Sequence, residues 1–294
     1  MTSTSTSSTI LITGANGNVS SATIRALQGK GHHLVGLVRD AKKGAELEKL
    51  GVKLVVGDLE KLRSVENAFE GIDTVFLCTT PGFMAPLALS NALWAARRGG
   101  AKHVVRLSAV GAAHDAPTLN SRLHALSDSE AKGSGLSWTL LQPHFFMQNL
   151  LMSAGAIQGQ GQIHYALGDA AVPMIDARDV GAVAAEVLAN PAAHSGKTYT
   201  LTGAAVTLHE VAAAIGAAIG KPVSYVPVPV AAAIEMMTKM GADEYRQVSL
   251  RDYLTAYSQG WQSSPTTSVK DVLGREPRSI AEFARDFARA FGAA

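Results

Sequence analysis

Charged residues are scarce in this sequence, and neither sign of charge is in excess. They make up 17% of the 294 residues, with 26 Lys and Arg against 24 Asp and Glu. A chain so near neutrality has no extended basic surface for nucleic acid or for an acidic membrane, so we expect neither partner. Hydrophobic residues, by contrast, reach 47%, which excludes a disordered chain and predicts a large buried core.

Cysteine and long apolar runs are lacking too. The single cysteine, Cys78, excludes an intramolecular disulfide and any CxxC motif, and it favours a cytoplasmic location. The uncharged stretches 74–96 and 133–168 are broken by Pro, Gly and polar residues, so neither resembles a membrane span of about 20 apolar residues. The opening MTSTSTSST has no segment typical of a targeting peptide. No set of side chains has the spacing of metal ligands, so we expect no metal.

The first half of the sequence alternates short apolar strands with helical patterns. Runs rich in β-branched residues lie at Thr9–Thr13, His33–Val38, Val52–Val56, Thr74–Cys78, His103–Leu107 and Ser137–Leu141. Such runs are typical of strands covered on both faces, and strand–helix–strand alternation gives right-handed parallel connections. We therefore predict an α/β fold with a Rossmann-like, doubly wound parallel sheet.

A glycine turn follows the first predicted strand. Gly14 permits a tight turn, and Gly17 lets the backbone approach a pyrophosphate just before a helix that carries no charge until Arg25. The amino end of that helix offers free N–H groups to phosphates. The sequence therefore predicts dinucleotide binding rather than an ordinary glycine turn. The expected contacts are Gly14, Asn16, Gly17, Asn18 and Val19.

The end of the second strand indicates which dinucleotide binds. Arg39 lies there, with Asp40 next to it and Lys42 and Lys43 behind. A guanidinium pairs well with the 2′-phosphate of NADP(H), so we favour that cofactor over NAD(H). Two alternatives remain: Asp40 could hold the adenine ribose, or the charges could form a solvated cluster that caps the next helix.

Polar residues also follow the later strands. Ligands of open parallel sheets bind outside the carboxyl ends of the strands, so we expect these residues to face one crevice. Asp58 and Ser108 have helix capping as an equal alternative. The further cofactor contacts predicted here are Asp58, Leu59, Thr79, Thr80, Ser108 and Pro143.

A series of motifs resembles the NmrA-like branch of the atypical short-chain dehydrogenase/reductases over nearly the whole chain. They are Ile12–Gly17, Val38–Asp40, Gly57–Leu59, Lys102–Ala112, His124 with Ser134–Thr139, and Gln142–Asn149. The resemblance implies NAD(P)H-dependent reduction of quinones, azo dyes or triphenylmethane dyes. Other members of the family bind the dinucleotide as a redox signal without turnover, so a non-catalytic NADP(H) sensor is the alternative.

The chain departs from the family pattern at three positions. Ser20 replaces the third glycine of the loop, which asks for looser helix–strand packing or for a hydroxyl contact. Gln142 replaces an arginine and His144 a small residue. Both of these positions are where the resemblance would place the substrate, so its identity is left open.

The proton-transfer dyad of standard short-chain dehydrogenases is missing, because none of the six tyrosines has lysine four residues on. A conjugated acceptor can take a hydride without that dyad, and the protein then mainly aligns the two rings. His124 and His144 are the predicted catalytic side chains, as proton donors or as hydrogen-bond donors to the acceptor, although His144 has a packed turn residue as its alternative. Phe83, Phe145, Phe146 and Asn149 are the predicted substrate contacts. Packing in the core is the alternative for the aromatics, and orientation of the turn is the alternative for Asn149.

The pattern of elements changes after Pro143. A helix is expected over 145–154, followed by a loop at the QGQGQ segment, residues 158–162, and then by a helix-rich remainder. We predict an NAD(P)-binding core over residues 1–150, to which residues 171–203 return. Residues 151–294 should form mainly a smaller cap on the substrate side. The expected partner is a small aromatic or conjugated substrate, and we allow for a homodimer.

Overall fold

The computed structural model describes residues 7–293, so residues 1–6 of the Ser/Thr-rich opening lie outside the described residues. Its contacts divide the chain into two units. Unit 1 takes in the chain up to His114, Asn120–Gln142 and Ala177–Thr200, and unit 2 takes in Asp115–Leu119, Pro143–Asp176 and the chain from Leu201 onward. The predicted division into a cofactor core and a substrate-side cap concerns function and stays a prediction.

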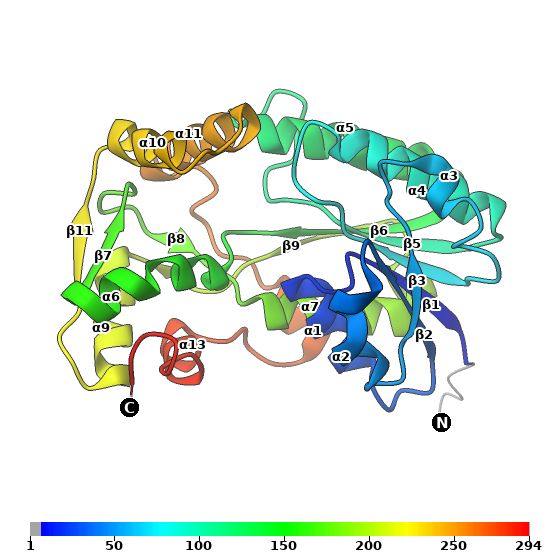
Figure 1. Cartoon of the computed structure of the whole chain (residues 1–294), viewed down its shortest axis with the longest axis horizontal. Coiled ribbons are helices and arrows are strands. Elements are labelled where there is room, and N and C mark those ends of the chain that lie inside the picture. The colour runs from blue at the N-terminus through cyan, green and yellow to red at the C-terminus, as the bar shows by residue number, and fades with distance from the viewer. Residues whose placement is uncertain (1–6, 294) are drawn as a thin grey trace. The chain divides into compact units, whose positions relative to one another are not determined.

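Unit 1 is built on a seven-stranded sheet with the order β3-β2-β1-β4-β5-β6-β9 (Figure 1). Its strands are β1 (Thr9–Thr13), β2 (His33–Val38), β3 (Lys53–Val56), β4 (Thr74–Leu77), β5 (His103–Leu107), β6 (Ser137–Pro143) and β9 (Lys197–Leu201). The neighbours from β3 to β6 all pair in parallel. The doubly wound α/β core predicted from the sequence is therefore confirmed.

Helices cover both faces of this sheet (Figure 1). On one face lie α1 (Asn18–Leu27) and α7 (Ala177–Ala189), which pack closely because Gly181 has no side chain: a Cβ there would lie 2.6 Å from the Cβ of Ala22. The other face carries α3 (Leu62–Val65), α4 (Ala85–Arg98) and α5 (Leu119–Gly133). The remaining elements of the unit are η1 (Ala41–Gly44), α2 (Ala45–Glu48) and α8 (Pro191–His194).

The strand order places a switch point between β1 and β4. From β1 the chain runs outward to β2 and β3, and then returns to the other side of β1 with β4. Open α/β sheets bind ligands outside the carboxyl ends of the strands at such a point. The connections after β1 and β4 are therefore where a ligand site is expected.

Unit 2 has two short sheets and most of the C-terminal helices. Strand β7 (Gln162–Tyr165) pairs in parallel with β11 (Ser224–Pro227), and β8 (Val172–Pro173) pairs antiparallel with β10 (Ala205–Val206). Its helices are η2 (Met147–Ser153), α6 (Ala154–Gln160), α9 (Leu208–Ile219), α10 (Val230–Lys239), α11 (Glu244–Ser258), α12 (Ser268–Leu273) and α13 (Ile280–Asp286).

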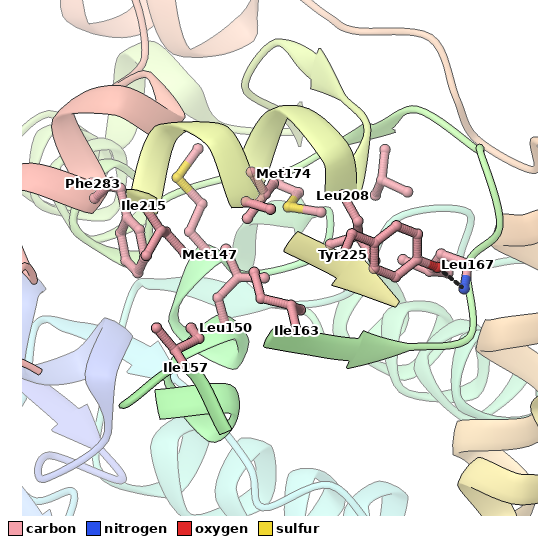
Figure 2. Packing of buried hydrophobic residues seen from close by; sticks show 14 of the residues in the cluster. Met147, Leu150, Ile157, Ile163, Leu167, Met174, Leu208, Ile215, Tyr225 and Phe283 are labelled. Carbon is pink, nitrogen blue, oxygen red and sulfur yellow. Dashed lines mark hydrogen bonds between the residues drawn. The ribbon is translucent and has the colours of Figure 1, made fainter. Parts of the chain in front are cut away.

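A separate apolar core holds unit 2 together (Figure 2). Ile215 of α9 and Phe283 of α13 are fully buried in it, together with Met147 and Ile163. Tyr225 of β11 satisfies its hydroxyl at the edge of this core, where it accepts a hydrogen bond from the N–H of Leu167 and donates one to the carbonyl of Tyr165.

The loop predicted at residues 158–162 is wrong. Helix α6 runs through this segment to Gln160, Gly161 caps it in the left-handed conformation with φ +64°, and β7 begins at the next residue. The helix persists because Ile157 is 3% exposed and anchors it in the core, which outweighs the low helix propensity of its glycines. Within residues 7–293, helices long and apolar enough to cross a membrane do not occur.

Candidate functional site

The turn between β1 and α1 has the geometry that its glycines predict. Gly14 adopts φ +55°, and the N–H of Gly17 donates to the carbonyl of Gly14 at 2.8 Å. A Cβ at Gly17 would lie 3.1 Å from that same carbonyl oxygen, so a side chain would crowd the turn. Both glycines therefore serve the close backbone approach that a phosphate needs.

The amino end of α1 is open for a ligand. Gly17 is the N-cap, no side chain caps the first N–H groups, and no acidic residue lies in the first turn. Asn16 and Asn18 are exposed beside it, whereas Val19 turns into the core at 6% exposure. Uncapped N–H groups and the helix dipole together suit a diphosphate, so the residues present fit a dinucleotide.

Hydroxyl groups tie this turn to the neighbouring strand. Ser20 Oγ donates to the carbonyl of Thr13 at 2.9 Å, which is a hydroxyl contact, the second of the two alternatives given for this replacement. Thr13 Oγ1 in turn accepts from the N–H of Cys78 and donates to the carbonyl of Cys78, both at 2.8 Å. These bonds fix the carboxyl ends of β1 and β4 against each other at the switch point. Burial raises the pKa of the Cys78 thiol, as expected for an inert cysteine.

The two charged residues at the end of β2, Arg39 and Asp40, have different surroundings. Asp40 accepts a hydrogen bond from the N–H of Lys42 at 3.0 Å and so caps η1. Arg39 is exposed and pairs with no carboxylate among residues 7–293. Of the predicted alternatives for Asp40, the cap is the role that the contacts support, and Arg39 remains available to a ligand.

The ends of β3 and β4 carry four more predicted cofactor contacts. The Asp58 carboxylate accepts from the N–H of Glu60 at 3.2 Å, a bond within its own turn, and it does not cap α3, whose N-cap is Lys61 without a side-chain cap. The carbonyl of Leu59 accepts from Asn91 Nδ2 at 2.8 Å, so the backbone of this turn is fixed by α4. Thr79 is half-buried and Thr80 exposed just after β4. Their contact with a cofactor stays a prediction.

A buried charge pair links β5, α5 and β6. Arg106 of β5 is 2% exposed, and its Nη1 donates to Oδ1 of Asp128 on α5. Ser108 Oγ donates to Oδ2 of the same carboxylate at 2.7 Å, and Gln142 Nε2 donates to it at 3.4 Å. Arg106 Nη2 also lies 3.2 Å from Nδ1 of His124. We call these five residues the Arg106 cluster.

His124 is the predicted catalytic residue that belongs to this cluster. Its side chain is half-buried on α5, and burial first and the Arg106 charge second lower the pKa of His124 well below 6.5. The imidazole is therefore neutral at physiological pH. Within residues 7–293 only Nδ1 is engaged in a hydrogen bond, which leaves Nε2 for a ligand.

His144 lies in unit 2 and is engaged at both ring nitrogens. Its Nδ1 accepts from the N–H of Phe145 at 2.7 Å, and its Nε2 donates to the carbonyl of Gln262 at 3.1 Å. The ring is 3% exposed and stacks on Tyr257 with centroids 4.9 Å apart. Burial lowers the pKa of His144 to about 4. A catalytic role for His144 stays a prediction, and these contacts favour the packed turn residue among its two alternatives.

The predicted substrate contacts differ in exposure. Phe83, in unit 1, is 52% exposed, whereas Phe145 is half-buried against the core of unit 2 with its ring edge-on to Tyr165. Phe146 is half-buried in a bridge to Ile175, and the N–H of Asn149 donates to the carbonyl of Phe146. Pro143 is the buried last residue of β6. Their contacts with substrate or cofactor stay predictions.

The sequence reasoning did not single out Arg106 and Asp128. A signal for both existed, because Arg106 is a charge inside the apolar strand HVVRL, and a charge buried there needs a partner. Asp128 lies four residues after His124, a spacing that puts both on one face of a helix. Among residues 7–293, no group of His, Cys, Asp and Glu could hold a metal ion.

The reversal of strand order at β1 and β4, with a glycine turn that opens onto an uncapped helix, defines the class of Rossmann-type dinucleotide-binding proteins. Within that class, the profile of the NmrA-like family matches residues 6–284. The chain belongs to the NmrA-like family, as its motifs suggested.

Two of the relatives among the curated proteins are named as reducing enzymes. The NAD(P)H azoreductase of Xenophilus azovorans is 39% identical over 287 residues, which are 97% of this chain and 100% of that relative. Quinone oxidoreductase 2 of Escherichia coli is 27% identical over 278 residues, which are 93% of this chain and 96% of that relative.

Solved structures show the same fold. The NADPH-dependent quinone oxidoreductase of Escherichia coli in complex with NADPH superposes with a TM-score of 0.83 at 25% identity, over 95% of this chain and 99% of that chain. The triphenylmethane reductase of Citrobacter sp. in complex with NADP(H) gives a TM-score of 0.82 at 21% identity, with the same coverage. At that identity the second likeness shows a shared fold alone.

Proposed function

We propose that this chain is an NAD(P)H-dependent oxidoreductase that transfers a hydride from NADPH to a conjugated acceptor such as a quinone, an azo dye or a triphenylmethane dye. The observation that carries the proposal is the 39% identity to the NAD(P)H azoreductase over 97% of the chain and the whole of that relative. The open amino end of α1 supports it, because a dinucleotide needs such a cradle.

The cofactor would be held by the turns of unit 1. The N–H groups of Asn18 and Val19 would receive the diphosphate, with Gly14, Asn16 and Gly17 in the turn beside them. Arg39 would pair with the 2′-phosphate, because it is exposed and its neighbour Asp40 is engaged in capping. We propose NADPH over NADH on this ground, and Asp58, Leu59, Thr79, Thr80, Ser108 and Pro143 as further contacts.

The nicotinamide supplies the hydride when the cofactor is bound. The chain lacks the Tyr-xxx-Lys dyad of standard short-chain dehydrogenases, which makes it an atypical member, and it does not need a phenol to protonate an alkoxide. We propose that His124 donates a hydrogen bond from Nε2 to the oxygen or nitrogen of the acceptor, and that water provides the proton. His144 is less suited, since both of its nitrogens are engaged.

Aromatic side chains would align the acceptor ring. Phe83 offers an exposed ring, and Phe145 and Phe146 follow β6 with Asn149 one turn later. Flat apolar surfaces favour conjugated rings, and holding two rings in register removes several kcal/mol of barrier. We propose these four residues as acceptor contacts.

The test is the loss of NADPH absorbance on addition of a panel of quinones, azo dyes, triphenylmethane dyes and enones. Gly17→Val should abolish turnover, because its side chain would crowd the turn and the approach of the diphosphate. The matched control is Gly155→Ala, where an added Cβ meets nothing within 4 Å. Tight NADPH binding without turnover of any acceptor would instead support a non-catalytic NADP(H) sensor. No binding of either nucleotide in calorimetry would overturn both functions.

The predictions on oligomeric state and cellular location can also be measured. A homodimer stays a prediction, which light scattering of the purified chain checks. A cytoplasmic location stays a prediction as well, checked by fractionation of the producing cell.

A further inference from the structure

The Arg106 cluster contains more polar contacts than the pairing of Arg106 with Asp128 requires. Arg106 and Asp128 neutralise each other, and apolar residues of similar volume would fill the same space at similar or better stability. Three elements nevertheless converge on this pair, because β5 supplies Arg106 and is followed directly by Ser108, α5 supplies Asp128, and β6 supplies Gln142. A buried network this well connected fixes the orientation of its members.

The guanidinium of Arg106 is held on one side and presents a donor on the other. Nη1 is fixed by Asp128, whose second oxygen is itself fixed by Ser108. Nη2 therefore points its N–H at a constant place, and Nδ1 of His124 lies there at 3.2 Å. Because His124 and Asp128 are four residues apart on α5, one helix face carries both partners of the guanidinium.

This contact determines the tautomer of His124. A guanidinium has five N–H donors and no acceptor, and it stays protonated in proteins. Nδ1 of His124 must therefore be the bare nitrogen that accepts, and the ring proton must sit on Nε2. Burial and, second to it, the positive charge of Arg106 also disfavour a second proton on the ring, which lowers the pKa of His124.

We propose that Arg106 and Asp128 are positioning residues that hold His124 as a neutral imidazole with its proton on Nε2. His124 then offers the acceptor a fixed hydrogen-bond donor and not a titrating acid. The role of the Nε2–H as a hydrogen-bond donor to the acceptor rests on the proposed function. The tautomer of His124 is a property of the folded chain and does not depend on that function.

The first experiment is nitrogen-15 NMR of the imidazole of His124 in the full chain, without any substrate. A protonated ring nitrogen and a bare one resonate far apart, so the spectrum assigns the tautomer directly. The wild type should show a single Nε2–H form. Arg106→Met should give a mixture of tautomers, whereas Arg63→Met, an exposed arginine of α3, should leave the spectrum unchanged.

A second variant keeps the test decisive if Arg106→Met fails to fold. Asp128→Asn preserves volume and releases the guanidinium from its ion pair, so it should also give a mixture of tautomers. Nδ1–H or mixed His124 in the wild type, or an unchanged spectrum in a folded cluster variant, would overturn the proposal.

The kinetic arm separates this proposal from the proposed function. Arg106→Met and Asp128→Asn should lower kcat about tenfold to a hundredfold through misplacement of the donor, with the KM for NADPH nearly unchanged. The wild type could show no turnover but a pure Nε2–H tautomer that the variants lose. That result would overturn the proposed function and support the positioning role. Turnover that is unchanged in variants whose tautomer is mixed would refute the role of the donor in the reaction.

Discussion

His144 lies at the turn after β6, and its replacement is expected to lower the free energy of unfolding and to leave the chemical step intact. Its two hydrogen bonds run to the backbone of Phe145 and Gln262, and its ring stacks on Tyr257. Gln262 adopts φ +58°, a left-handed conformation that a non-glycine residue holds only when its surroundings support it. The bond from His144 to its carbonyl is part of that support.

The magnitude follows from what His144→Ala removes. Each hydrogen bond contributes about 1 kcal/mol net, and the ring pair about 0.5–1.5 kcal/mol beyond its buried area. Since His144 is only 3% exposed, the cavity and the two unsatisfied backbone groups add to this, and the total loss should be about 3–5 kcal/mol. His144→Asn can still accept from the N–H of Phe145, so its loss should be about 1–3 kcal/mol.

The same replacement should change stability toward acid. The folded pKa of His144 is about 4 and its ordinary value is 6.5, so the unfolded chain binds the proton more tightly. The contribution of His144 is therefore fully present above pH 6.5 and is lost as the pH falls toward about 4. At about 1.4 kcal/mol per pKa unit, the loss approaches about 3 kcal/mol, and His144→Asn should remove it.

Urea unfolding at neutral pH and at about pH 5, with kcat measured on the same preparations, tests this reasoning. His103 is the matched control, since it is 3% exposed with a pKa of about 4 and bonds to Ser137 and Thr139 in unit 1. His103→Asn should remove a similar acid sensitivity. A His144→Asn protein that unfolds like the wild type at both pH values but has a kcat lower by about a hundredfold would refute the structural reading and restore His144 as a catalytic residue.

Two further predictions concern the cofactor and the packing of unit 1. Arg39→Ala should weaken NADPH binding by about 1.5–3 kcal/mol, or roughly tenfold to a hundredfold, and leave NADH binding nearly unchanged. The control Lys43→Ala should weaken NADPH binding far less. Equal losses of affinity for both nucleotides in calorimetry would show that Arg39 does not contact the 2′-phosphate. Gly181→Ala should lower the free energy of unfolding by about 1–3 kcal/mol, because its Cβ would lie 2.6 Å from that of Ala22, and a stability equal to that of Gly155→Ala would contradict the close helix contact.

The strands were predictable because each is an apolar run that the parallel sheet buries on both faces. Strands β1, β2 and β5 begin and end at the predicted residues. The helical segment between β2 and β3 is divided into η1 and α2, with Gly44 at the break. A Cβ at Gly44 would lie 2.4 Å from Leu54 Cδ1, so the break is set by a contact with a residue that lies beyond the helix in the sequence. Local propensity carries no information about such a contact.

The site was predictable where backbone conformation determines it and not where long-range pairing does. Gly14 adopts φ +55°, a conformation that glycine alone adopts freely, and Gly17 has no side chain that would crowd the carbonyl of Gly14. The roles of Asp40 and Asp58 depended on whether a backbone N–H lay within reach, and only the folded turns decide that. The sequence places each carboxylate at a strand end, but it does not say whether the carboxylate faces its own chain or a ligand.

The charged and titratable side chains of unit 1 that are left available to a ligand are hydrogen-bond donors. Asp40 and Asp58 accept hydrogen bonds from their own turns, and Asp128 is closed by Arg106 and Ser108. What remains toward a ligand, among the charged and titratable groups discussed for unit 1, is the guanidinium of Arg39 and the Nε2–H of His124, together with the N–H groups of α1. All three are donors. Such a set suits ligands that bring acceptors, namely the phosphates of a dinucleotide and the carbonyl or azo group of an oxidised substrate, and it disfavours an alcohol that must first lose a proton to a base.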